Sequence, residues 1–191
     1  MTDTQLVKEF RNGDIRAFNK LVERWQHRIH RLAYRYFSSH DDAMEITQKT
    51  FIRVYKKLDT LDDAEKFPSW IYRIANNLCL DEVKRAGRRK SSSLDVLKVE
   101  RITKSVQANP EHSLQNSELG EILQHALNQL SAEQRIVVIL KEYEGLKFRE
   151  IAEILEEPEN TVKSRMYYGL KKLKDIFNQW NINIEALNYE S

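Results

Sequence analysis

The segment from Gly145 to Lys174 constrains the fold more than any other, because it combines two helical patterns with a built-in break. The first pattern is an apolar stripe with the i, i+3, i+4 and i+7 spacing of one helix face: Phe148, Ile151, Ala152 and Leu155. Pro158 cannot continue that helix but suits the start of another, whose positive end favours the carboxylate of Glu159. The segment therefore predicts two helices joined by a tight turn.

The second predicted helix has one apolar face and one face that suits the major groove of DNA. The face expected to be buried consists of Val162, Met166, Gly169, Leu170 and Leu173. The opposite arc carries Asn160, Ser164, Tyr167, Tyr168 and Lys171, and the flanks carry Lys163, Arg165 and Lys172. Donors and aromatic rings on one rigid face, bordered by cations, favour readout of base edges. A helical hairpin with a solvated basic side is the structural alternative.

The composition favours a helical protein of one or two domains. The chain has 191 residues, 41% hydrophobic and 31% charged, with only five glycines and three prolines, unlike a turn-rich β protein. Cys79 is the single cysteine, so we expect no internal disulfide and a small, packed side chain. The sequence contains no apolar run near the ~18 residues of a membrane span and no signal-peptide pattern, which favours the cytoplasm.

The net charge of +2 hides two cationic concentrations that lie far apart in the sequence. The first places five cations in seven residues, namely Lys84, Arg85, Arg88, Arg89 and Lys90. The second consists of Lys163, Arg165, Lys171, Lys172 and Lys174. Because a polyanion responds to local patches, these two clusters indicate two contacts with one long ligand.

We predict an all-α fold of two small helical domains. The first domain, residues 1–88, begins with a short helix around Leu6 to Phe10 and a long helix capped by Asp14. A helix from Asp41 to Leu58, an acidic loop from Asp59 to Glu65 and a third helix from Pro68 to about Arg85 follow.

The second domain is expected after a serine-containing flexible linker over residues 89–109. Order resumes with a cap at Asn109 before Pro110, and the domain covers residues 110–178. A capping box from Ser131 to Gln134 opens the helix before the helix-turn-helix segment. The tail over residues 179–191 either packs as an extra turn or extends from the domain.

One arc of the third helix is a candidate nucleic-acid surface. Arg73, Asn77 and Lys84 share this arc, with Asn76 nearby and Lys66 at the helix entrance. An asparagine amide can read a base edge, whereas cations neutralise phosphate. A solvated or capping pair is the alternative for the two asparagines.

The helix from Asp41 to Leu58 has a second exposed arc, formed by Glu45, Gln48, Lys49 and Ile52. An exposed isoleucine beside mixed charges fits a protein–protein contact, although single apolar residues are common on surfaces.

The sequence offers little for catalysis. His27 and His30 lie at i, i+3 without a compelling third metal ligand, and neither a Gly-rich phosphate loop nor a serine elbow is found. We therefore expect no enzymatic activity, no metal and no cofactor.

Five segments together resemble the extracytoplasmic-function (ECF) sigma factors of bacterial RNA polymerase, in particular the RpoE-like envelope-stress group. They are GDIRAFNKLVERWQHRI, DAMEITQKTFIRVYKKLDTL, KFPSWIYRIANNLCLDEVKRAGRR, NPEHSLQNSEL and LKFREIAEILEEPENTVKSRMYYGLKKLK. The resemblance implies a first domain that binds the clamp helices of the large subunit of core RNA polymerase and melts the minus-ten promoter element. The second domain would place a helix in the major groove of the minus-thirty-five element. An anti-sigma factor, often membrane-anchored, commonly holds such proteins inactive.

The resemblance also implies roles for individual residues. Those at the polymerase contact are Glu45, Gln48 and Ile52, with Lys49 on the same arc. At the minus-ten element the resemblance implies Asn77 at the base-reading position, with Arg73 and Lys84 on the same side. From the arc and the basic cluster of the third helix we add Lys66, Asn76, Arg85 and Arg88 to this site. At the minus-thirty-five element the resemblance implies Lys163, Ser164, Tyr167 and Tyr168, and the exposed face of the same helix adds Asn160, Arg165 and Lys171. Tyr168 and Leu170 stand where the family often has arginine. This departure implies a minus-thirty-five sequence that differs from the one used by close relatives.

Two other functions fit parts of the sequence. A stand-alone helix-turn-helix regulator would bind a palindromic site without polymerase. A helical scaffold or anti-sigma-like protein would bind no DNA.

Overall fold

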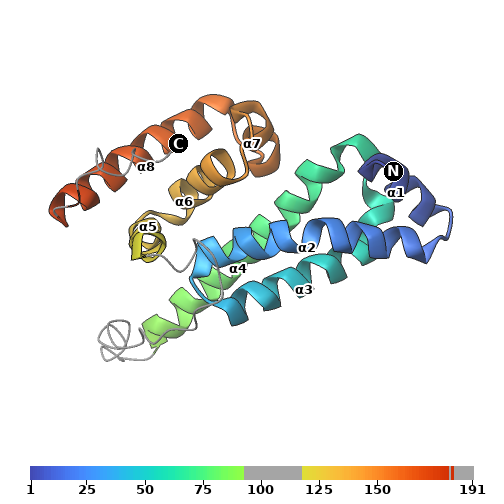
Figure 1. Ribbon diagram of the computed structural model, residues 1–191, viewed down its shortest axis with the longest axis horizontal. Coiled ribbons are helices and arrows are strands. Elements are labelled where there is room, and N and C mark those ends of the chain that lie inside the picture. The colour runs from blue at the N-terminus through green and yellow to red at the C-terminus, as the bar shows by residue number, and fades with distance from the viewer. Residues whose placement is uncertain (93–117, 181, 183–191) are drawn as a thin grey trace.

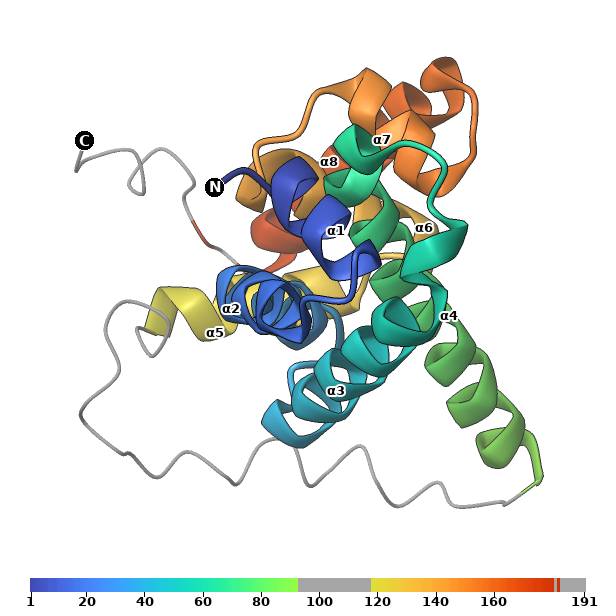
Figure 2. The same ribbon diagram turned by 90° about the vertical axis from the view of Figure 1, so that its right-hand side faces the viewer.

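The computed structural model of the chain describes residues 1–92, 118–180 and 182, with only the backbone described at 87–92, 118 and 119. Within these ranges every regular element is helical, which confirms the predicted fold class (Figures 1 and 2). The predicted helix start at Asn109, the linker from residue 93 onward and nearly all of the predicted tail lie outside the described residues. Across the described ranges, each helix is too short or too polar to span a lipid bilayer.

The N-terminal domain contains four α-helices, α1 (Asp3–Arg11), α2 (Ile15–Phe37), α3 (His40–Lys57) and α4 (Phe67–Ser92). Two 3-10 turns, Leu58–Thr60 and Ala64–Lys66, occupy most of the segment predicted as an acidic loop. The helix α4 begins one residue before Pro68 and continues past the predicted end near Arg85. Pro68 fits the first turn because a first-turn N–H has no partner within the helix.

The C-terminal domain contains α5 (Glu118–Asn128), α6 (Ala132–Val138), α7 (Phe148–Leu155) and α8 (Glu159–Gln179). The chain widens into a π-helical turn over Ile139–Tyr143 at the end of α6. Gly169 allows α8 to approach α6 closely, since a Cβ at this position would lie 3.2 Å from Cγ2 of Val138. Its burial was predicted, but the predicted burial of Leu170 is wrong, because that side chain is 46% exposed.

Capping side chains fix the predicted helix starts. The Oδ1 atom of Asp14 accepts the Arg16 N–H at 3.0 Å and opens α2. Ser131 and Gln134 form the predicted reciprocal capping box at the start of α6. These caps are local interactions, which is why the sequence predicts them well.

The core of the N-terminal domain is built around Trp25, whose ring meets those of Phe67 and Tyr72 edge-on at 5.9 and 5.4 Å. Cys79 is fully buried, as predicted, and this burial raises the pKa of its thiol. Ile15 is half exposed, as it occupies the first position of α2.

The two domains pack against each other, which the sequence did not predict. The helix α4 lies against α7, and α2 contacts α5, so the main apolar cluster contains residues of both domains (Figure 2). This contact decides which of the predicted binding residues face solvent.

Candidate nucleic-acid and protein-binding surfaces

The outer face of α8 presents most of its predicted DNA-reading residues to solvent. The exposed residues of this set are Asn160, Lys163, Ser164, Tyr167, Tyr168 and Lys171. Arg165 differs, because its guanidinium pairs with the Glu157 carboxylate at 2.9 Å and its side chain is only 25% exposed. Arg165 therefore ties α8 to the turn that precedes it.

Two polar residues of this face are engaged by their own helix. The Lys163 ammonium lies 2.6 Å from the Glu159 carboxylate, and the Ser164 hydroxyl donates to the Asn160 carbonyl at 2.6 Å. An exposed ion pair contributes at most about 1 kcal/mol, so Lys163 can exchange Glu159 for a phosphate at little cost. The oxygen of Ser164 retains its capacity to accept a hydrogen bond.

The predicted DNA arc of α4 is only partly exposed. Asn77, Lys84 and Arg85 face solvent, as does Lys66 just before the helix. Arg85 pairs with the Glu82 carboxylate at 2.9 Å. The side chain of Arg88 lies outside the described residues.

The C-terminal domain covers the rest of this arc. The Arg73 guanidinium pairs with the Glu156 carboxylate at 2.8 Å and donates to the Glu153 carbonyl at 2.9 Å. Asn76 is only 3% exposed, so the prediction that it is accessible to DNA is wrong for this arrangement. On the helical wheel Asn76 lies between Tyr72 and Arg73, both of which bond to the C-terminal domain.

A partly buried hydrogen bond joins the two domains. The Tyr72 hydroxyl donates to the Glu144 carboxylate at 2.6 Å. Burial, then the adjacent carboxylate, raise the pKa of Tyr72, so the phenol remains a donor at neutral pH. Nearby, the Arg35 guanidinium lies 4.1 Å from the Tyr143 ring centroid. The π-helical turn ends at Tyr143, directly before Glu144. It therefore positions Tyr143 for its contact with Arg35 and Glu144 for its bond with Tyr72.

The domain contact contains poorly satisfied polar groups. Among the described residues, the buried side-chain atoms without a hydrogen-bond partner are Nε of Arg73, Oδ1 of Asn76, Nε of Arg135 and Oε1 of Glu144. Arg73, Arg135 and Glu144 bond across the contact through their other atoms. Each unsatisfied group costs about 1–3 kcal/mol, and separation of the domains would return these atoms to water.

The predicted protein-binding arc forms an exposed ridge on α3. Glu45, Gln48 and Ile52 are exposed, whereas Lys49 is partly covered and lies 2.5 Å from the Glu45 carboxylate. Sequence reasoning missed two exposed apolar side chains of the same helix, Met44 and Tyr55. The i, i+4, i+8 spacing of Met44, Gln48 and Ile52 is the signal that could have extended the arc.

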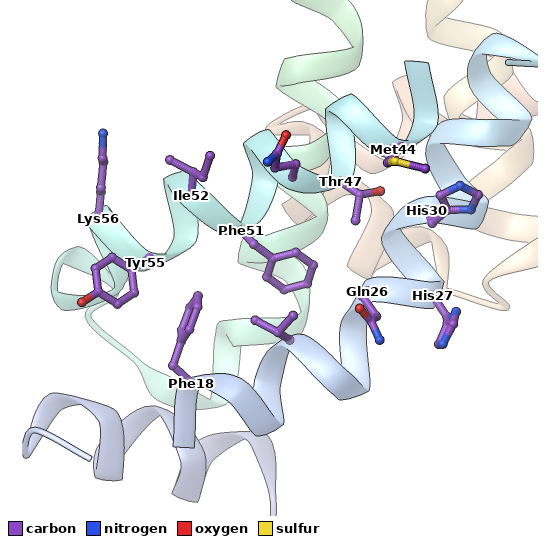
Figure 3. Close-up of a pocket in the computed structure, with 12 residues that line it drawn as sticks. Phe18, Gln26, His27, His30, Met44, Thr47, Phe51, Ile52, Tyr55 and Lys56 are labelled. Carbon is purple, nitrogen blue, oxygen red and sulfur yellow. The ribbon is translucent and has the colours of Figure 1, made fainter. Parts of the chain in front are cut away.

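A groove of about 740 Å³ runs between α2 and α3 beside this ridge (Figure 3). Phe18 from α2 and Phe51 from α3 project into it, and the ring of Tyr55 meets that of Phe18 edge-on at 5.1 Å. Burial lowers the pKa of His30, with help from His40 and His27, which favours an uncharged imidazole in the groove wall. The groove is therefore a mainly apolar surface.

A second hollow of about 410 Å³ lies between α3 and α4, on the other side of the ridge. It combines charged side chains with the apolar residues Ile46, Ile52 and Leu78. Its cationic lining residues are Lys49, Arg53, Lys56, Lys57 and Arg85, and its acidic ones are Asp81 and Glu82. Ile52 lines both hollows, so the ridge projects between a mainly apolar surface and one of mixed character.

Comparison with known proteins identifies the class. Residues 21–89 match Sigma-70 region 2, and residues 120–173 match Sigma-70, region 4. The two matches coincide with the two packed domains. The chain is thus a sigma-70-type transcription initiation factor, built from the regions that carry the candidate surfaces.

Similar whole chains narrow the class to one family. The ECF RNA polymerase sigma-E factor of Salmonella typhimurium is 35% identical over 173 residues, covering 87% of this chain and 90% of that protein. The ECF RNA polymerase sigma factor SigW of Bacillus subtilis is 32% identical over 173 residues, covering 88% of this chain and 92% of that protein. The chain belongs to the ECF sigma factors, which decides against the stand-alone regulator.

A solved structure supports the fold. RpoE of Bartonella quintana, in complex with the anti-sigma factor NepR, has a TM-score of 0.70 and 24% sequence identity, covering 86% of this chain and 98% of that chain. The likeness concerns the arrangement of the helices, in which both domains of the present chain take part.

Proposed function

We propose that this ECF sigma factor binds core RNA polymerase through the ridge of α3 and contacts promoter DNA through the outer faces of α4 and α8. The observation that carries the proposal is the exposed ridge of Gln48 and Ile52, which projects between two hollows. An exposed aliphatic side chain flanked by charged and amide groups suits a protein partner that buries it centrally.

We further propose that the domains separate when polymerase and promoter are bound. In the packed arrangement the Arg73 guanidinium is paired with Glu156 of the C-terminal domain, and the Asn76 side chain is buried. Separation gives the unsatisfied polar atoms of the contact access to water, which lowers its net cost. Two tethered domains held on one polymerase can then raise avidity for DNA by about 10²–10⁴.

Promoter melting is assigned to the exposed part of α4. Asn77 would bind an unpaired base of the minus-ten element, and Lys66 and Lys84 would bind the backbone phosphates. Capture of that base offsets an unstacking cost of a few kcal/mol. RNA synthesis itself belongs to the polymerase, so we assign no covalent chemistry to this chain and place its action in the cytoplasm, beside the promoter.

We propose that an anti-sigma factor, membrane-anchored or not, inhibits the protein by occupying the apolar groove between α2 and α3. The groove is mainly apolar and is lined from Phe18 to His30 of α2, which suits an amphipathic helix, and it shares Gln48 and Ile52 with the ridge. A partner seated there would therefore block polymerase as well.

The test introduces a charge at the centre of the ridge. Ile52→Glu is expected to weaken binding to core polymerase at least about tenfold, because a carboxylate replaces a side chain that the complex buries. Ile15→Glu is the matched control, since Ile15 is 50% exposed and Ile52 49%, but Ile15 lies on α2 and lines neither hollow.

Affinity for core polymerase, measured by fluorescence anisotropy of the labelled sigma factor, separates the outcomes. Equal binding by wild type and Ile52→Glu would remove the ridge from the polymerase interface. Equal losses in both variants would indicate a general effect of added negative charge.

A further inference from the structure

Two adjacent tyrosines form the most exposed aromatic surface of the C-terminal domain. Tyr167 is 64% exposed and Tyr168 is 58% exposed, and their rings meet edge-on with centroids 5.4 Å apart. We call this pair the tyrosine edge. It stays uncovered in the packed arrangement of the domains, so its apolar area is available to an external ligand.

The tyrosine edge lies on the face of α8 opposite the buried stripe. Val162, Met166 and Gly169 are buried and fix the inner side of the helix. Long helical side chains lean over the preceding turn, which places the two rings above the small residue Ser164. The edge therefore sits at the centre of the outer face rather than at its margin.

The polar groups around the edge are less available than the edge itself. Lys163 is paired with Glu159, and the Ser164 hydroxyl donates its hydrogen bond to the backbone carbonyl of Asn160. Arg165 is turned away toward Glu157. Arginine is a common bidentate reader of guanine, and the single arginine of α8, Arg165, is paired with Glu157 in this arrangement.

The charge around the edge suits duplex DNA. Lys163, Lys171 and Lys172 are exposed and border the rings, so they can contact phosphates on either side of the groove. In the major groove the one apolar feature of a base pair is the C5-methyl group of thymine. An aromatic surface framed by lysines is complementary to that combination.

We propose that the tyrosine edge reads thymine methyl groups in the major groove of the minus-thirty-five element. The inference rests on the proposed function and adds the chemistry of its readout. The rings supply apolar contact with one or two adjacent A·T pairs, and the lysines supply affinity without sequence preference.

The test removes the methyl group from DNA and leaves the base pair intact. Run-off transcription from a promoter library by the reconstituted holoenzyme first selects functional minus-thirty-five elements. Each thymine of a selected element is then replaced by deoxyuridine, and holoenzyme affinity is measured. One buried methyl group corresponds to about a fourfold loss for the wild-type protein.

Variants of the edge assign the effect to the rings. Tyr167→Ala with Tyr168→Ala should bind thymine and deoxyuridine promoters equally, whereas the double phenylalanine variant should keep the fourfold difference of about 0.8 kcal/mol. Because both side chains are exposed, the helix content of each variant by circular dichroism is expected to be unchanged.

The outcomes separate the two proposals. Wild-type holoenzyme that starts correctly but ignores deoxyuridine overturns the methyl readout and leaves the sigma-factor assignment intact. Selected elements without thymine in either strand overturn it as well, and so does a deoxyuridine effect that survives the double alanine change. Failure to start at any promoter contradicts the proposed function and the readout together.

Discussion

The two candidate DNA surfaces, on α8 and on α4, differ in how much of each is exposed to solvent. On α8 the tyrosine edge and its lysines face solvent, and their polar contacts are made within the helix or its adjoining turn. On α4, Arg73 is paired with Glu156 of the other domain and Asn76 is buried. On the proposed assignment, the α8 surface can meet duplex DNA as it stands, whereas the α4 surface becomes complete only after the domains separate.

The difference teaches that one domain can engage residues of the other that we propose to bind DNA. The Glu156 carboxylate and the Glu153 backbone carbonyl contact Arg73, so neither a phosphate nor a base can use the same N–H groups until these bonds break. If the proposed assignment holds, the domain contact limits minus-ten binding by the free protein but not minus-thirty-five binding.

The largest expected effect breaks the domain contact. Tyr72→Phe retains the ring that packs on Trp25 but leaves the partly buried Glu144 carboxylate without this donor. A hydrogen bond to a charged group contributes about 1.5–3 kcal/mol, so the equilibrium should shift about ten- to a hundredfold toward separated domains. Energy transfer between dyes on the two domains measures the shift.

Tyr55→Phe is the matched control for that change, because Tyr55 is half exposed on α3 and lies away from the domain contact. An unaltered energy-transfer signal in Tyr72→Phe would mean that the Tyr72–Glu144 bond does not hold the domains together.

A second change tests the part of α4 that is already exposed. Asn77→Ala should slow open-complex formation by about tenfold while leaving polymerase affinity intact, because it removes one base contact and no core packing. Permanganate footprinting of the melted region measures the effect. Asn19→Ala makes the same chemical change on the exposed side of α2, and equal defects in both variants would exclude a specific role for Asn77.

The smallest effect concerns the open surface of α8. Lys163→Ala should weaken binding to the minus-thirty-five element by about threefold and reduce the salt slope of log K by about 1, as one phosphate contact is lost. Titration of holoenzyme binding over a range of salt concentrations gives the slope. An unchanged slope would show that Lys163 stays paired with Glu159 and does not touch phosphate.

Local patterns explain what could be predicted. The helix starts at Asp14 and Ser131, the break at Pro158 and the exposed arc of α8 all depend on residues within a few positions of one another.

The wrong prediction that Leu170 is buried has a geometric cause. Gly169 faces α6 directly, and the next residue, about 100° further round the helix, already reaches solvent.

Long-range contacts explain what could not be predicted. Arg73 and Glu156 are 83 positions apart, and Tyr72 and Glu144 are 72 positions apart. No periodic pattern in the sequence relates the two residues of either pair. The same holds for the groove, which requires Phe18 of α2 and Phe51 of α3 to lie on facing sides.

The sequence alone determined the helices, their caps, the family and the chemical character of each exposed arc, because these depend on helical periodicity and neighbouring side chains. Only the tertiary structure decided that Arg73 pairs with the end of α7 and that Asn76 is buried, while the tyrosine edge of α8 stays open. The physical reason is that burial depends on which surfaces meet after the chain has folded. The sequence of a helix predicts the polarity of each of its faces, but it does not predict which domain will pack against that face.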